Sequence, residues 1–215
     1  MRTSYKSIVD FLRIDFLLTF KNSVLLCIVY LLLIPVIRGI SNLDNIHSAG
    51  VLGQSVALIG AIILIPITKR ELEASVKEII YTKAWSYLKS IGIRFLCGFL
   101  MITILITVFA VIMQRYDCVF PFWEYVSSTI LYSVFLGLLG LMLSQAGNNI
   151  IIGYLSALGY WSFCQLQIIN ANSVAYMFPI INGTVEIQKL ITLFLIATFL
   201  FGVFLFLIKY SISRV

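Results

Sequence analysis

Long apolar stretches, each free of Asp, Glu, Lys and Arg, alternate with short charged or turn-forming segments along the chain. Four of them stand clearly apart, at 22–37, 48–68, 95–114 and 190–208. A helix needs about 20 apolar residues to cross the hydrocarbon core of a bilayer, and the first stretch is the shortest of the four. Lipid offers no partner to an unpaired backbone amide, so these stretches predict membrane-spanning helices.

A fifth interval, 125–185, contains no charged residue and is too long for one span. Two polar breaks divide it, "SQAGNN" at 144–149 and "NANS" at 170–173, the second followed by Pro179 and Asn182–Gly183. Such clusters of Asn, Gly and Pro favour turns. The pattern therefore predicts six transmembrane helices, near 22–39, 48–68, 94–114, 125–144, 149–169 and 188–208. The short "SQAGNN" turn predicts that the fourth and fifth form a tight antiparallel pair.

Residues 3–20 have a different pattern. Tyr5, Ile8, Leu12 and Phe16 recur at helical spacing, while charged residues such as Asp10 fall between them. Those charges disfavour a span, and the pattern predicts an interfacial amphipathic helix. A disordered tail is the alternative.

The basic residues fall mainly in the segments on one side of the six predicted spans. Three basic residues, Arg38, Arg115 and Lys189, lie on one side, and the other twelve of the fifteen on the side that holds both termini. The positive-inside rule therefore predicts cytoplasmic N- and C-termini. The net charge of +6 reflects this topology and contact with anionic lipid.

Composition agrees with a membrane protein, at 61% hydrophobic and 11% charged residues with a mean hydropathy of +1.05. Soluble domains have about twice that share of charge. We therefore expect an all-α polytopic membrane protein, with residues 1–215 forming a single transmembrane domain in the lipid bilayer. No soluble basic domain is expected, so nucleic acid is not an expected partner.

Motifs for chemistry on this chain are lacking. The sequence has no GxxxxGK[ST] loop, HExxH or GxSxG, and its four cysteines and one histidine have no metal-ligand spacing. No catalytic residue, cofactor or metal is therefore expected, and an enzyme is disfavoured. Gln54, Gln145, Gln165 and Gln167 are expected to bridge helices or reach the interface, with substrate ligation as the alternative.

Small residues in the fourth and fifth predicted helices indicate close helix packing. These are Gly137, Gly140, Gly153, Ala157 and Gly159.

A charged segment, 69–90, separates the second and third predicted spans on the cytoplasmic side. Leu72, Val76, Ile79 and Ile80 share one helical face, and Glu73 and Lys77 form a favourable i,i+4 pair on another. The segment predicts an amphipathic helix that either lies on lipid or docks into a cytoplasmic partner.

The order of features resembles the membrane subunits of ABC-2 type ABC transporters, of the small six-span bacterial type. The resemblance rests on "KRELEASVKEIIYTKAWSYLKSIGIRF", where Arg70–Glu71, Ala74–Ser75, Ile79–Ile80 and Arg94 follow the family order. The proline usual near Thr82–Lys83 in the family is absent, as are long extracellular insertions.

The resemblance implies that two such membrane subunits, identical or different, pair with two cytoplasmic ABC ATPase subunits, which bind ATP and Mg. It implies a bacterial plasma membrane location and a coupling helix within 70–81. The residues expected to dock on the ATPase are Arg70, Glu71, Leu72, Glu73, Val76, Lys77, Ile79 and Ile80.

An interior seam free of charge and rich in aromatic residues suits an amphipathic or hydrophobic substrate, such as a hydrophobic peptide or a lipid-like molecule. The resemblance implies export, with an antimicrobial peptide as one such substrate. A non-transporting immunity or scaffold protein that binds a peptide or partner is the alternative.

Overall fold

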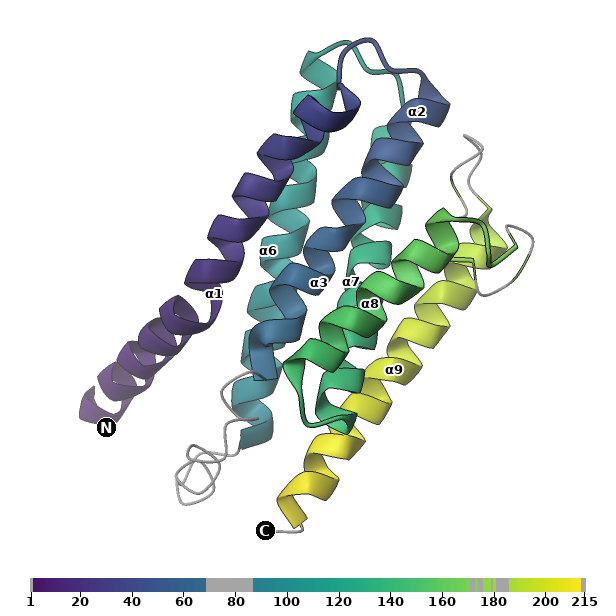
Figure 1. Cartoon of the computed structure of the whole chain (residues 1–215). Helices are drawn as coiled ribbons and strands as arrows, with labels where there is room; N and C mark the ends of the chain where they lie inside the picture. Colours follow the sequence, from purple (N-terminus) through teal and green to yellow (C-terminus); the bar gives the residue numbers. More distant parts are fainter. Residues whose placement is uncertain are drawn as a thin grey trace.

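The computed structural model describes residues 2–68, 87–170, 173, 176–178, 180 and 186–213. All regular structure in these residues is helical, and the helices run antiparallel to one another in sequence order (Figure 1). The helices are α1 (Arg2–Arg38), α6 (Tyr87–Arg115), α7 (Phe122–Ala146), α8 (Ile150–Gln165) and α9 (Ile187–Ser213), together with the segmented second span, Asn45–Thr68.

The two ends of the bundle carry different connections. The connection between α1 and the second span and the connection between α6 and α7 lie at one end, called the Cys118 end (Figure 1). The α7–α8 turn, the described end of the second span at Thr68 and the start of α6 lie at the other end, called the Thr68 end, together with the start of α1 and the end of α9 (Figure 1). The start of α1 and the end of α9 therefore lie at the same end of the bundle, while the cytoplasmic location of both termini stays a prediction.

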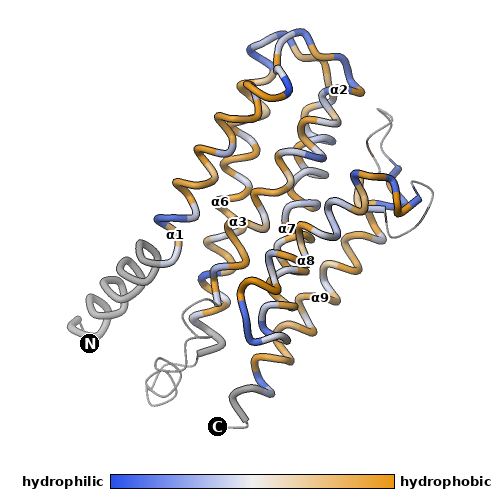
Figure 2. Tube along the Cα trace, viewed as in Figure 1, coloured by the Kyte–Doolittle hydropathy of each residue, from blue (hydrophilic) through white to orange (hydrophobic). Residues whose placement is uncertain are grey.

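Five of the six predicted spans are confirmed as helices long and apolar enough to cross a membrane. They are Thr19–Arg38, Asn45–Thr68, Ser90–Arg115, Phe122–Ala146 and Ile187–Tyr210. Figure 2 shows apolar residues along these helices and hydrophilic residues at the turns.

The predicted fifth span, 149–169, is shorter than expected. Its helix α8 has 16 residues, which at about 1.5 Å per residue is shorter than the roughly 30 Å hydrocarbon core. The helix ends at Gln165 because the chain turns at Leu166, and Gln167 adopts a left-handed φ of 55°.

The prediction of a separate interfacial helix at 3–20 is not supported. Helix α1 runs from Arg2 to Arg38 without a break, and its one proline, Pro35, lies in the last turn. No Gly or Pro stands between residues 3 and 34, so nothing in the backbone ends the helix where its composition changes near Lys21. The interfacial position of 3–20 stays a prediction.

The second span and α7 form the centre of the bundle. Most of each is buried, 72% and 61% of the apolar window, against 22% to 28% for α1, α6 and α9. Helix α7 packs against the second span, α6, α8 and α9. The outer helices therefore keep wide apolar faces, which suit lipid as solvent.

Close contact between α7 and two of its neighbours, the second span and α8, depends on glycine. A Cβ on Gly60 would lie 1.7 Å from the Ser133 carbonyl oxygen, and one on Gly153 would lie 2.5 Å from that of Gly140. The prediction of close packing is thus confirmed at Gly140 and Gly153, and also at Gly137 and the buried Ala157. It is wrong for Gly159, where a Cβ would meet nothing within 4 Å.

Two connections cover the Cys118 end and are joined by backbone hydrogen bonds. The Asn42 amide donates to the Tyr116 carbonyl (3.0 Å), and the Val119 amide donates to the Leu43 carbonyl (2.9 Å). Cys118 is buried, and its Sγ donates to the Ile40 carbonyl (3.1 Å). This thiol thus has a structural role in holding the two connections together.

Candidate functional site: an apolar groove and a polar helix junction

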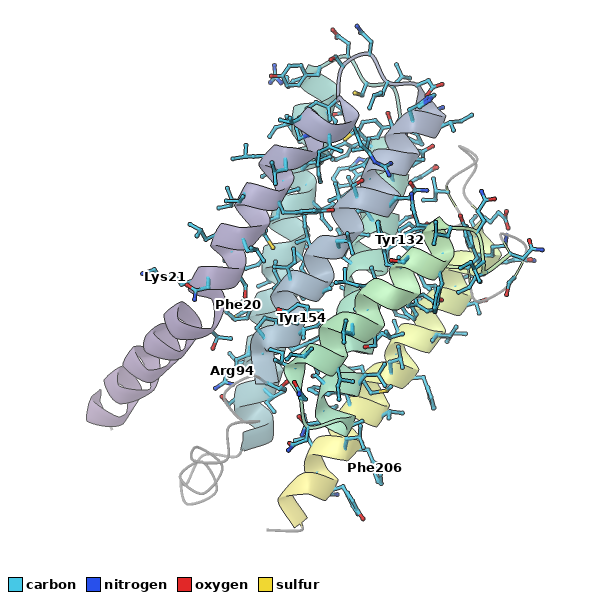
Figure 3. The ribbon with its side chains drawn as sticks, in the orientation of Figure 1. Phe20, Lys21, Arg94, Tyr132, Tyr154 and Phe206 are labelled. Atoms are coloured by element: carbon cyan, nitrogen blue, oxygen red, sulfur yellow. The ribbon has the colours of Figure 1, made fainter. Side chains whose placement is uncertain are left out.

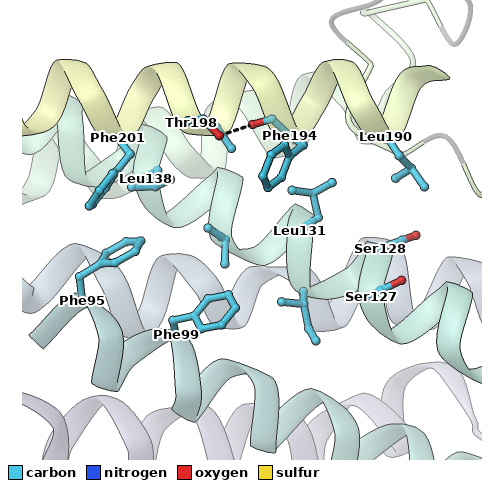
Figure 4. A pocket seen from close by; sticks show the side chains of 13 residues that line it. Phe95, Phe99, Ser127, Ser128, Leu131, Leu138, Leu190, Phe194, Thr198 and Phe201 are labelled. Carbon is cyan, nitrogen blue, oxygen red and sulfur yellow. Dashed lines mark hydrogen bonds between the residues drawn. The ribbon is translucent and has the colours of Figure 1, made fainter. Parts of the chain in front are cut away.

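A groove with a volume of about 460 Å³ lies between α6, α7 and α9 (Figure 4). Thirteen residues line it: Phe95, Phe99, Ser127, Ser128, Ile130, Leu131, Val134, Leu138, Leu190, Phe194, Ala197, Thr198 and Phe201. Its volume falls within the range of about 300–1,000 Å³ that is common for small-molecule sites.

Helical periodicity brings these residues together from three distant parts of the sequence. Phe95 and Phe99 are one turn apart on α6, and Leu131 and Leu138 share one face of α7. The rings of Phe95 and Phe201 contact each other across the groove, with centroids 4.7 Å apart. This pair joins α6 to α9 at the left of Figure 4.

The three hydroxyl groups that line the groove bond to their own helices. Ser127 and Ser128 donate to the Glu124 carbonyl at 3.1 and 2.7 Å. Thr198 donates to the Phe194 carbonyl at 2.9 Å, the dashed bond in Figure 4. No ionisable side chain is found among the described residues that line the groove, so the groove suits a hydrophobic molecule.

The groove also reaches the outer surface of the bundle. Phe194 on α9 is 59% exposed and Phe99 on α6 is 36% exposed, and both line it. In a bilayer this surface faces the acyl chains. A hydrophobic molecule could therefore reach the groove from the side, without passing through water.

A second candidate site is a polar junction in the second span, where the helix is irregular. A short helix α2 (Asn45–Ala49) is followed by a π-helical turn, η1 (Gly50–Ser55), and a tight 3₁₀ turn, η2 (Val56–Leu58). Helix α3 (Ile59–Leu64) and a further 3₁₀ turn, η3 (Ile65–Thr68), complete the span. Isolated π-helical turns occur frequently at functional sites.

Side chains from two neighbouring helices bond to the irregular backbone. Trp161 Nε1 on α8 donates to the Gln54 carbonyl (2.7 Å), and the Tyr30 hydroxyl on α1 donates to the Ser55 carbonyl (2.8 Å). The π-helical turn is thus held from both sides.

The Gln54 side chain joins the same three elements. Its Oε1 accepts from Gln165 Nε2 (2.8 Å) and from both terminal nitrogens of Arg38 (3.2 Å each). Arg38 also donates to the Gly50 carbonyl (3.3 Å). The prediction that Gln54 and Gln165 bridge helices is confirmed, and Gln167 lies exposed in the turn after α8.

Sequence reasoning missed Arg38, Trp161 and Tyr30 as members of this junction. The sequence pattern identifies Arg38 only as a basic residue at a span end. Trp161 and Tyr30 lie within apolar stretches, where a lipid-facing aromatic residue has the same pattern. The sequence contains no signal that pairs them with Gln54.

The eight predicted ATPase-docking residues lie outside the described residues. They are Arg70, Glu71, Leu72, Glu73, Val76, Lys77, Ile79 and Ile80, and their grouping stays a prediction. The described residues that flank the segment are tied together, because Arg94 on α6 is buried and its Nη1 donates to the Ile67 carbonyl (3.2 Å). Figure 3 shows Arg94 beside the lower part of the second span.

Comparison with protein-family models, curated proteins and solved structures found no match to this chain. Within the described residues, no group of three or more His, Cys, Asp or Glu side chains could hold a metal ion.

Proposed function

We propose that this chain is the membrane-spanning subunit of an ATP-driven ABC transporter of the ABC-2 type. Its substrate is an amphipathic or hydrophobic molecule, such as a peptide or a lipid-like compound, and export is the expected direction. The observation that carries the proposal is the groove between α6, α7 and α9, which is apolar, lacks ionisable side chains and opens toward the lipid-facing surface.

The proposal requires an energy source outside the described residues. No charged side chain lines the groove, and the sequence has no nucleotide-binding loop, so a separate ATPase must supply the work. The segment 69–90 is the proposed docking element. Its flanks at Thr68 and Tyr87 lie at one end of the bundle (Figure 1), and the Arg94–Ile67 bond would transmit a displacement of either flank to α6 and the second span together.

A second membrane subunit is part of the proposal, because two ATPases need two docking elements. The bacterial plasma membrane, with both termini in the cytoplasm, is the proposed location. The first experiment is a search of the neighbouring coding sequences for a Walker-motif ATPase and co-purification of that ATPase with the chain, followed by a measurement of substrate-stimulated ATP hydrolysis in vesicles. A chain that binds substrate without an ATPase and without turnover would instead be an immunity or scaffold protein.

Reversing the charges of the docking segment tests the coupling role. We expect the double variant Glu71→Lys with Lys77→Glu to lose ATPase co-purification at least tenfold while inserting normally, because each change places like charges against the partner. The measurement is the ATPase-to-subunit ratio in the purified complex.

The matched control is the double variant Glu186→Lys with Lys189→Glu. It reverses an ion pair of 2.8 Å at the start of α9, at the opposite end of the bundle. Wild-type co-purification and coupled activity in the Glu71–Lys77 variant would refute docking through this segment.

Filling the groove tests the substrate role. Ala197 lines the groove, whereas Leu195 on the same helix is 61% exposed and lies outside its lining. We expect Ala197→Trp to abolish substrate-stimulated ATP hydrolysis with the ATPase still bound, since the indole would occupy the site. Leu195→Trp should retain stimulation, and equal stimulation in the two variants would place the substrate elsewhere.

A further inference from the structure

Arg38 stands at the end of α1 with its guanidinium fixed in direction. Two hydrogen bonds to Gln54 Oε1 and one to the Gly50 carbonyl hold the group against the π-helical turn. The side chain is nevertheless exposed. The ion pairs found among the described residues join His47 to Asp44 and Lys189 to Glu186, so no described carboxylate neutralises Arg38.

A guanidinium has five N–H donors and cannot lose its charge in a protein. The bonds to neutral oxygens of Gln54 and Gly50 orient the group without neutralising it. An oriented, exposed and uncompensated arginine at a span end suits a phosphate, which it can bind in a bidentate manner.

A partly exposed stripe begins beside this charge and continues as apolar surface. Gln54, Leu58 and Ile62 follow one another at intervals of four along the second span, and each is only half-buried, whereas most other residues of the span are buried. In Figure 1 this part of the chain lies between α1 and α8. The second span therefore reaches the outer surface along a stripe that runs from the Arg38 charge toward the Thr68 end.

The position of Trp161 indicates that the Arg38 end of the stripe lies at the membrane–water interface. Trp161 of α8 bonds to the Gln54 carbonyl (2.7 Å) at the head of the stripe. Tryptophan is enriched at the membrane–water interface, where lipid phosphates lie.

We propose that Arg38 and the stripe of Leu58 and Ile62 form a binding site for one anionic phospholipid. The phosphate would pair with the guanidinium, and one acyl chain would follow the stripe between α1 and α8. The site is separate from the groove between α6, α7 and α9, and it does not depend on the proposed transport function.

The test measures lipid retained by the whole chain purified in neutral detergent. Native mass spectrometry would compare added phosphatidylglycerol with phosphatidylcholine. We expect the wild-type chain to retain the anionic lipid preferentially, and Arg38→Gln to lower that retention about tenfold, as expected for loss of one charge-assisted pair. Arg115→Gln, an exposed arginine at the end of α6 at the same end of the bundle, should retain the wild-type preference.

Two further measurements complete the test. One distinguishes a bound lipid from a bound free anion, and the other uses a second variant in case Arg38→Gln misfolds. Ile62→Trp leaves the charge intact and obstructs the stripe, so it should also reduce phosphatidylglycerol retention, while inorganic phosphate should not displace the lipid. Equal retention by the Arg38 and Arg115 variants would overturn the proposal. So would full retention by Ile62→Trp, or displacement by inorganic phosphate, which would identify a free-phosphate site.

Discussion

Replacing Gly60 with alanine is expected to lower the free energy of unfolding by about 3 kcal/mol or more, the upper range for overpacking a core. The added Cβ would lie 1.7 Å from the Ser133 carbonyl oxygen, 2.3 Å from its carbon and 2.7 Å from its Cα. These are backbone atoms of α7, so no side-chain rotation can relieve the clash. The second span and α7 would have to separate at the centre of the bundle, where both helices are mostly buried.

The measurement is thermal unfolding of the purified chain in detergent, with a matched glycine control. A Cβ added to Gly202 of α9 would meet nothing within 4 Å. Gly202→Ala should therefore be neutral or stabilising by up to about 1 kcal/mol, the helix-propensity difference. If the Gly60→Ala and Gly202→Ala variants unfolded at the same temperature, the second span and α7 would not pack as closely at Gly60 as the structure shows.

The positions of the spans could be predicted because lipid leaves the backbone few alternatives. A charge-free stretch such as 95–114 must be helical to satisfy its amides, and α6 covers it. Hydropathy is less informative about where a helix ends. Residues 166–169 are as apolar as α8, yet the helix ends at Gln165, and the change in composition near Lys21 does not interrupt α1.

The sequence predicted the chemical type of the interior, but not which residues form the two candidate sites. The sequence predicted an apolar, aromatic interior, but the groove combines Phe95, Leu131 and Phe194 from three helices, and only packing selects them. The π-helical turn at Gly50–Ser55 leaves no trace in hydropathy. For Gly159 the sequence predicted a close helix contact that the structure does not show, because a Cβ there would meet nothing within 4 Å.

Replacing Arg94 is the other change expected to have a large effect on the free energy of unfolding. Its side chain is 8% exposed, and its Nη1 donates to the Ile67 carbonyl at the described end of the second span (3.2 Å). A neutral hydrogen bond between membrane helices is worth about 0.6 kcal/mol on average, whereas a bond to a charged group is worth about 1.5–3 kcal/mol. We therefore expect Arg94→Leu to cost about 2–3 kcal/mol in the free energy of unfolding.

Arg94→Leu should also destabilise the protein locally, around the bond that it removes. Hydrogen exchange in Arg94→Leu should rise at the amides of Ile65–Thr68 and in the first turns of α6, the two elements that the guanidinium joins. Arg94→Lys should fall between wild type and Arg94→Leu, because an ammonium keeps the charge but lacks the planar fork. Arg115→Leu, an exposed arginine at the other end of α6, is the control. Equal unfolding temperatures for the two leucine variants would show that the Arg94–Ile67 bond does not hold α6 to the second span.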